Sequence, residues 1–486
     1  MPRQFLSLVV LLAAALACAV CAEAASSPIL RSVAAAAPPG RFHVGLSNCP
    51  PVSSTDPSGV DALSSVAAAG ISYCRCGMSD WASNTTASID SEWQYLNELE
   101  ERGLKGWLWL GTAANIRAEA NAATSHRGRP SSPRRHHRAA APSATESAAL
   151  LTTLVQAFRN HSALLAYKGW DEPQWGKVDP AGLIRAYDLV HSMDPVHPLV
   201  LIQAPRGTVS ELAAYEPAYD VTGCDIFPVA YPPGMHSDLP NKEISVVGDV
   251  TQRIRASTGT SGKPVWMTLQ IAWSGMLPSV AKPHVPRFPS TLQERFMLYD
   301  AAIAGASGVS FFGGTLTSVM SSADAAAGFN WRFFDSVLRP LVAEVTSPEV
   351  QEALTAPVVD PEYAVTYTLN ATTLRLSTRN TDRYLFVLAV CTGGDTARVR
   401  LSNLPLRNDG QPLTQGQVLG EWVQDPLPPG ANTGSEVWED LGIDENHPSL
   451  ANSTQAPRFI AVDEGFSFDD WFGRFDTHVY RFDLSD

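Results

Sequence analysis

Short apolar runs alternate with amphipathic segments along residues 41–355 of the chain. Eight runs have the length of a buried strand, and they occupy residues 42–45, 71–76, 106–110, 164–170, 199–202, 219–227, 264–269 and 308–312. The segments between them repeat apolar residues at helical spacing, as at Leu183, Ile184, Tyr187 and Val190. Eight strands that alternate with helices predict a (β/α)8 barrel, the TIM-barrel fold.

The residues at the predicted helix ends agree with this pattern. Asp179-Pro180 opens one helix, Thr291 precedes another, and Gly305 follows the latter. Asp or Thr before a helix and Gly after it are favoured at helix ends. A doubly wound open sheet also alternates, but it usually carries a Gly-rich phosphate-binding loop after an early strand, and the sequence has none. We therefore favour the closed barrel.

The pattern changes near residue 356. Helical spacing stops, and short strand-like runs follow at residues 373–378, 384–390, 397–401 and 477–482, separated by clusters of Gly and Asn. Such runs predict an all-β domain. We expect a β-sandwich-like domain over residues 356–486, behind an α/β barrel over residues 41–355.

A basic segment interrupts the barrel pattern after its third strand. Residues 118–144 lack an apolar period and contain Arg134-Arg-His-His-Arg among Ala, Ser and Pro. This composition predicts a disordered insertion. Binding of an acidic polymer is the alternative interpretation.

The first residues have the features of an export signal. Arg3 precedes an apolar run over residues 8–20 that is short for a membrane span, and residues 22–24 fit the cleavage pattern of signal peptidase. We expect a signal peptide over residues 1–24 and a linker over residues 25–40. Four glycosylation sequons agree with a secreted glycoprotein, or one at the cell surface or in the endomembrane lumen: Asn84, Asn160, Asn370 and Asn452.

Charge and cysteine content narrow the class of partner. The net charge of −14 is spread along the chain, which argues against nucleic acid or an anionic membrane as the main partner. Beyond the leader we find no apolar segment long enough to span a bilayer. Five cysteines follow the leader, so at least one is unpaired within the chain. Packing, or a bridge from Cys49, explains them better than a zinc site, and we expect no metal or cofactor.

Polar and aromatic residues gather where the predicted strands end. In a barrel the active site lies at the carboxyl ends of the strands. The polar residues there are Asn48, Arg75, Asp171, Glu172, Gln203, Asp225 and Gln270. The aromatic residues there are Trp109, Trp170, Trp175, Tyr231 and Trp273. Aromatic faces pack against sugar rings while polar groups bind hydroxyls, so the mixture predicts a site for an oligo- or polysaccharide.

Glu172 is the best candidate for a catalytic acid. It follows an apolar strand, precedes Pro173, and has Trp170 and Trp175 close in sequence. An apolar setting raises the pKa of a carboxyl group and keeps it protonated, as glycoside hydrolysis requires of its acid.

Residues 165–173, which end in Trp-Asp-Glu-Pro, resemble the fourth strand of the barrel glycoside hydrolases of clan A. In those enzymes the strand ends in Asn-Glu-Pro or a close variant. Residues 263–270 and 295–312 resemble the seventh strand and the last helix with the eighth strand. The resemblance covers residues 41–355 and implies that Glu172 is the acid/base.

Two departures from the clan pattern bear on the mechanism. The clan's nucleophile is a Glu at the end of the seventh strand, where this chain has Gln270, and the clan's Asn before the acid is Asp171 here. Asp225 is one candidate for the second carboxylate, and we then expect the wide spacing of inverting enzymes. Alternatively, Asp171 orients a substrate amide, as in substrate-assisted hexosaminidases. A third interpretation is a carbohydrate-binding barrel without catalysis.

Other enzyme classes lack their motifs. The sequence has no Gly-x-Ser-x-Gly elbow and no His-Glu-x-x-His pair. Gly262-Lys263 is followed by Pro264, so there is no P-loop. The first strand lacks the paired histidines of metal-dependent barrel hydrolases.

Overall fold

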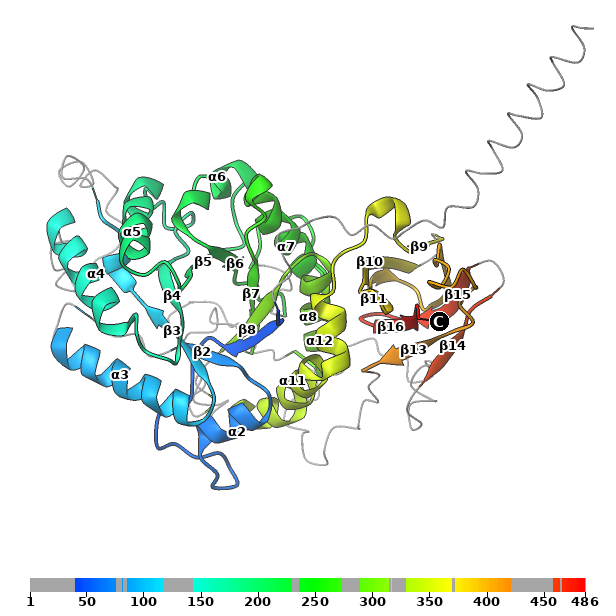
Figure 1. Cartoon of the computed structure of the whole chain (residues 1–486), viewed down its shortest axis with the longest axis horizontal. Helices are drawn as coiled ribbons and strands as arrows, with labels where there is room; N and C mark the ends of the chain where they lie inside the picture. Colours follow the sequence, from blue (N-terminus) through cyan, green and yellow to red (C-terminus); the bar gives the residue numbers. More distant parts are fainter. Residues whose placement is uncertain are drawn as a thin grey trace, which may run out of the picture.

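The computed structural model describes residues 40–75, 81, 85–117, 143–229, 236–271, 289–313, 316, 329–368, 372–420, 458–463 and 466–485. Two parts are visible in Figure 1, a larger α/β part and a smaller β part. The expected leader and residues 118–142 of the expected insertion lie outside the described residues. Ser143 caps a helix that begins at Ala144, so the last residue of that predicted segment is helical.

The first part is a barrel, which confirms the predicted fold. Its strands are β1 (His43–Leu46), β2 (Tyr73–Arg75), β3 (Lys105–Trp109), β4 (Leu164–Asp171), β5 (Leu199–Gln203), β6 (Val221–Cys224), β7 (Trp266–Gln270) and β8 (Gly308–Phe312). They pair in parallel in the order β6-β5-β4-β3-β2-β1-β8-β7. Isolated parallel bridges between Thr222 and Val265 and between Asp225 and Thr268 close the ring.

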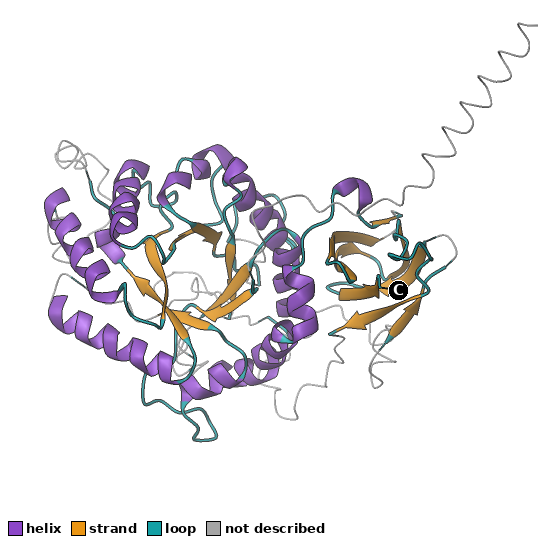
Figure 2. Cartoon of the chain, viewed as in Figure 1, coloured by secondary structure: helices purple, strands orange, loops and turns teal. Residues whose placement is uncertain are grey.

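Helices surround this ring (Figure 2). They are α2 (Ala62–Ala68), α3 (Thr85–Glu101), α4 (Ala144–Phe158), α5 (Pro180–Met193), α6 (Val209–Ala213), α7 (Val246–Ser257), α8 (Thr291–Ile303), α10 (Phe329–Phe333), α11 (Arg339–Thr346) and α12 (Pro348–Thr355). Single-turn helices are η1 (Gly111–Ala114), η3 (Glu216–Ala218), η4 (Gly259–Ser261) and η7 (Pro361–Tyr363), and the π-helix η6 (Phe334–Leu338) joins α10 to α11.

The helix caps follow the expected chemistry with one correction. Asp179 caps α5, whose first residue is Pro180. The cap of α8 is Ser290, which forms a reciprocal pair with Gln293, and Thr291 is already the first helical residue. Ser accepts hydrogen bonds from the free amides of the first turn as Thr does. The cap predicted from the sequence therefore lies one residue after the observed cap at the amino end of α8. None of the described helices combines the length and the apolar composition that a membrane crossing needs.

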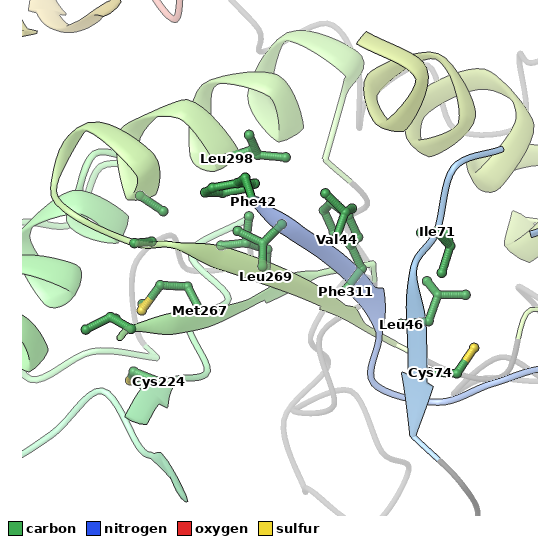
Figure 3. Packing of buried hydrophobic residues seen from close by; sticks show 14 of the residues in the cluster. Phe42, Val44, Leu46, Ile71, Cys74, Cys224, Met267, Leu269, Leu298 and Phe311 are labelled. Carbon is green, nitrogen blue, oxygen red and sulfur yellow. The ribbon is translucent and has the colours of Figure 1, made fainter. Parts of the chain in front are cut away.

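Two apolar layers hold the barrel. Outside the strands, Phe42, Val44 and Leu269 lie against α8, as Figure 3 shows around Leu298. Inside, Tyr73 packs against both Trp107 and Trp266 with ring centroids 5.5 Å apart. These aromatic rings fill the interior, so the polar strand ends are the accessible chemistry of the barrel.

The second part is an antiparallel β domain, as predicted. One sheet has the order β10-β11-β16-β13-β14, and the other has the order β15-β12-β9. The strands are β9 (Thr366–Tyr367), β10 (Thr372–Asn380), β11 (Tyr384–Gly394), β12 (Ala397–Ser402), β13 (Gln415–Leu419), β14 (Phe459–Ala461), β15 (Ser467–Phe472) and β16 (Thr477–Asp483).

Strand β11 has two buried faces. Phe386, Leu388 and Val390 join the apolar core of the barrel. The alternating residues, among them Leu385 and Val387, join the core of the β domain. Because successive side chains of a strand point to opposite faces, β11 is shared between the two parts. The continuous apolar run at residues 384–390 reflects this double burial.

Charged side chains also cross between the two parts. Arg295 of α8 donates two hydrogen bonds to the Glu344 carboxylate of α11, at 2.8 and 2.9 Å, and another to the Thr477 carbonyl oxygen of β16 at 2.5 Å. Arg375 of β10 pairs with Asp300 of α8 and with Asp249 of α7. These buried pairs fix the β domain against α7, α8 and α11.

The described cysteines are unpaired. Cys49, Cys74, Cys224 and Cys391 are all free and buried, which leaves packing as their described role, and Cys76 lies outside the described residues. Among the described residues, no three His, Cys, Asp or Glu side chains gather in a way that could hold a metal ion.

Candidate active site

Glu172 lies directly beyond the end of β4, at the carboxyl end of the barrel. Its backbone amide donates to the Ile202 carbonyl oxygen of β5 at 2.9 Å. Its φ of 45° is in the left-handed region, which costs a residue with a side chain about 1–3 kcal/mol. The following turn holds it there, because Gly176 N donates to Glu172 O at 2.9 Å. The backbone thus keeps Glu172 in an unfavourable conformation at the predicted site.

Asp225 faces Glu172 from the end of β6. The bridge between Asp225 and Thr268 of β7 fixes its backbone. The two carboxyl groups are close enough for one to donate a hydrogen bond to the other when the pair holds a proton. Oδ1 of Asp225 has no hydrogen-bond partner and is shielded from solvent.

The pKa values of both carboxyl groups lie above their usual range. Burial is the largest of the causes that raise the pKa of Asp225, and the negative charges of Glu172 and Asp171 add to the effect. Burial also raises the pKa of Glu172, and this outweighs the hydrogen bond with Asp225, which lowers it. Two carboxyl groups in contact cannot easily ionise together, so the pair holds one proton to higher pH than an isolated carboxyl group does.

Asp171 forms an ion pair with a buried lysine at the end of β4. Its Oδ1 lies 2.6 Å from Nζ of Lys168, which is buried on the same strand. Burial raises the pKa of Asp171, but the charges of Lys168 and Arg75 outweigh it and hold the pKa below its usual range. Asp171 is therefore an anion at neutral pH, whereas the pKa values of the pair beside it lie above their usual range.

Three other predicted residues meet beside this ion pair. Nη2 of Arg75 donates to Oδ1 of Asn48 at 2.8 Å. The Arg75 guanidinium lies 5.8 Å from the ring centroid of Trp109, and Lys168 Nζ lies 5.2 Å from it. Strands β1 to β4 thus bring Asn48, Arg75, Trp109 and Asp171 together at their carboxyl ends.

Gln203 and Gln270 are enclosed by protein atoms. Gln270 is fully buried, accepts a hydrogen bond from Val229 N at 2.9 Å and donates one to Val229 O at 2.5 Å. Gln203 accepts one from Gln174 N at 3.3 Å, and its buried Nε2 has no partner. In this structure the two amides hold the loops after β6 and β4 in place.

The predicted aromatic residues differ in exposure. Trp170 is half-buried and packs against the barrel core. Trp175 is 55% exposed, and the guanidinium of Arg206 lies 4.8 Å from its ring centroid. Tyr231 and Trp273 lie outside the described residues.

Lys168, Arg206 and His236 belong to this region but were not singled out from the sequence. The only signal in the sequence that could have identified Lys168 is its position within an apolar strand. His236 Nε2 lies 4.0 Å from Asp225 Oδ2, while its Nδ1 accepts from Phe227 N at 3.1 Å. Burial lowers the pKa of His236 to about 4, so the ring is neutral at pH 7. Neither Arg206 nor His236 stands at a strand end, and no sequence signal identifies them.

Comparisons with known proteins give structural likeness only. No protein-family model and no curated protein matches the chain. A solved glycoside hydrolase aligns with 91% of this chain and 92% of its own, at 10% identity and a TM-score of 0.49. A GH30 endoxylanase from Clostridium papyrosolvens aligns with 93% of this chain and 98% of its own, at 12% identity and a TM-score of 0.47. A family 39 glycoside hydrolase from Bacteroides cellulosilyticus aligns with 91% of this chain and 81% of its own, at 13% identity and a TM-score of 0.44.

Proposed function

We propose that the chain is a secreted glycoside hydrolase in which Glu172 is the general acid and Asp225 its carboxyl partner. The observation that supports this function is the contact between these two side chains at the carboxyl end of the barrel, where both pKa values are raised. An acid that must be protonated at neutral pH needs such a setting.

The reaction follows from the single proton of the pair. Glu172 takes up the shared proton from Asp225 and transfers it to the glycosidic oxygen as the bond from that oxygen to the anomeric carbon breaks. The pair then carries two negative charges, which stabilise the positive charge on the sugar. Water attacks the anomeric carbon and returns a proton to the pair, so the enzyme ends as it began.

The contact also bears on the stereochemical question. Hydrogen-bonded carboxyl groups are closer than the separation of about 5–5.5 Å in retaining enzymes or about 6.5–9.5 Å in inverting ones. The wide spacing that the sequence led us to expect stays a prediction for the site with substrate bound. We assign Asp225 to sharing the proton and stabilising charge. Asp171 is less suited to either task because Lys168 already neutralises it.

Secretion is part of the proposal. The leader-like residues 1–24 support it, and so does the sequon at Asn160, which is exposed in the turn after α4. Asn84, Asn370 and Asn452 lie outside the described residues. Expression in a eukaryotic secretory host should yield medium-borne protein that begins after residue 24 and loses mass on treatment with an N-glycosidase. Retention of the leader in the mature protein would contradict secretion by this route.

The catalytic assignment is tested with purified protein on a panel of aryl glycosides and polysaccharides. Glu172→Gln and Asp225→Asn should each lower turnover about 10²- to 10⁴-fold, because each removes a member of the proton-sharing pair. Asp188→Asn, on the exposed face of α5, is the matched control and should keep full activity. Full activity of Asp225→Asn would exclude Asp225 and return attention to Asp171.

A carbohydrate-binding barrel without catalysis is the second candidate. The observation that favours it is the amide of Gln270 at the expected nucleophile position, fully engaged with Val229. Binding of a polysaccharide by the wild-type protein, with no hydrolysis of any substrate in the panel, would support this candidate over the first.

A further inference from the structure

We propose that the sugar recognised at this site carries an oxyanion, foremost the carboxylate of a uronic acid, and that Arg206 binds this group beside the face of Trp175. This inference rests on the proposed function, because it names the substrate class of the same site. Arg206 then determines specificity.

The two side chains come from loops at the same end of the barrel as the candidate acid. Trp175 follows Glu172 by three residues in the loop after β4, and Arg206 lies in the loop after β5. The guanidinium lies 4.8 Å from the Trp175 ring centroid, and the indole is 55% exposed. The exposed part of the indole offers an apolar surface to a sugar ring, and the cation over the indole suits a negatively charged substituent on that sugar.

The loops that carry them are held together. Gln174 N donates to Oε1 of Gln203 at 3.3 Å, which ties the loop after β4 to β5. Gly207 has a φ of 87°, and a Cβ there would lie 2.7 Å from the Gln174 side chain. Gly207 N also donates to Oδ2 of Asp238 at 2.9 Å. Binding to such a held arrangement costs little ordering entropy.

Arg206 lacks the carboxylate partner that neighbouring cations have. Lys168 pairs with Asp171 at 2.6 Å, and Arg253 pairs with Asp238 at 2.6 Å. Across the ranges that the structure describes, Arg206 forms no ion pair. A guanidinium presents donors in a planar fork that fits a carboxylate with two hydrogen bonds. This geometry favours a uronate over other anions.

The charge of Arg206 also acts on the acid. Its positive charge works to lower the pKa of Glu172, against the larger effect of burial. A bound carboxylate neutralises that charge and lets the pKa of Glu172 rise. The acid is then protonated over a wider pH range when an anionic substrate is bound than when the site is empty.

Matched pairs of 4-nitrophenyl glycosides test the inference on the full-length enzyme. Each pair compares a glucuronide with the glucoside, or a galacturonide with the galactoside, in both anomers, and a 6-sulfated glycoside is a third arm. We expect kcat/KM to favour the anionic member by about 10- to 100-fold, the range for a hydrogen bond to a charged group. A preference for the sulfated arm over the uronide also supports the inference and identifies sulfate as the oxyanion.

Variants connect the preference to Arg206. Arg206→Gln should reduce the ratio of anionic to neutral kcat/KM to about one, and Arg206→Lys should retain part of it. Arg398→Gln is the control, because Arg398 is an exposed arginine of β12 in the β domain, and it should leave the ratio unchanged. For the wild type on an anionic substrate, the alkaline limb of kcat should lie at higher pH than that of kcat/KM, and Arg206→Gln should remove this difference.

Failure of the inference differs from failure of the proposed function. Equal rates on neutral and anionic members, or a preference that survives Arg206→Gln, would overturn the inference and leave the hydrolase assignment intact. If no substrate is cleaved, calorimetry with a uronic-acid oligosaccharide and the Glu172→Gln protein decides. Binding that Arg206→Gln abolishes supports the inference without catalysis, and absence of binding overturns it.

Discussion

Lys168 and Asp171 form a 2.6 Å ion pair on one face of β4, although three positions separate them along the strand. In a regular strand residues three apart point to opposite faces. Against β5, Lys168 pairs with Val200 and Asp171 with Ile202, so β4 contains one extra residue between them. This β-bulge turns Asp171 towards Lys168 and leaves Glu172 to face Asp225.

Removing the Lys168 charge should shift the pH dependence of activity. The positive charge of Lys168 works to lower the pKa of Glu172, so Lys168→Met favours the protonated acid. The alkaline limb of kcat/KM should therefore move to higher pH. Lys105→Met, at the exposed amino end of β3, should leave the profile unchanged. An unshifted limb in a folded Lys168→Met protein would show that the two groups are not coupled.

The left-handed backbone at Glu172 predicts a gain in stability from glycine. Glu172→Ala and Glu172→Gly both remove the carboxyl group, but only glycine relieves the φ of 45°. We expect Glu172→Gly to exceed Glu172→Ala in free energy of unfolding by about 1 kcal/mol, measured in urea, with both proteins inactive. Equal stability of the two variants would count against strain at this position.

A carboxyl group at position 270 should destabilise the fold in a pH-dependent way. The Gln270 amide donates to the Val229 carbonyl oxygen, and a carboxylate cannot. Only the protonated form of the side chain in Gln270→Glu can replace that donor, so its pKa rises on folding. Stability should then fall as pH rises from about 4 to 8, relative to wild type. Melting curves across this range check the sign, and a pH-independent difference would exclude this mechanism.

Asp470 should make the β domain sensitive to acid. Its carboxylate accepts two hydrogen bonds from Arg458 at 2.8 Å and one from Tyr480 at 2.8 Å. Burial raises its pKa, but His478 and Arg458 outweigh burial and hold the pKa of Asp470 well below its usual range. A carboxyl group whose pKa is lower in the folded state stabilises the fold at pH values above its unfolded pKa. This contribution is lost as the pH falls from the unfolded pKa towards the folded pKa.

Asp470→Asn should therefore cost about 3 kcal/mol at pH 7, because it replaces the charged acceptor of a buried ion pair with a neutral amide. The difference from wild type should shrink below pH 4, because this carboxyl group then takes up a proton in the unfolded state while the folded carboxylate stays charged. Chemical denaturation at pH 7 and pH 3 measures both values. Exposed Asp409→Asn is the comparison, and an equal loss in that variant would show that the effect is not specific to the network.

The fold was predictable from the sequence because its main signal is local. Each barrel strand is an apolar run, and each run of the eight-fold pattern corresponds to an observed strand. Strand β15 was missed because Asp469 and Asp470 interrupt its apolar residues. The compensation for buried Asp470 comes from Arg458, His478 and Tyr480, which the sequence does not mark as neighbours.

The site was predictable only where strand ends determine it. Glu172 and Asp225 follow β4 and β6, so a closed barrel brings them to one end of the ring. The bulge that pairs Lys168 with Asp171 depends on register against β5, which no residue type announces. Arg206 is recognised only through its ring contact with Trp175, which arises when two loops are packed together.

The interface between the barrel and the β domain limits which segments of this protein can be exchanged with those of another protein. Arg295, Asp300 and the outer face of β11 are satisfied only when barrel and β domain are both present. A barrel that ends after α12 would lack Phe386 of β11, and the core residues of the barrel that pack against it would be exposed. Asp300 would also lose its ion pair with Arg375. The β domain is therefore not a transplantable module, and engineered chimeras of this protein should take their crossover points within loops of the barrel.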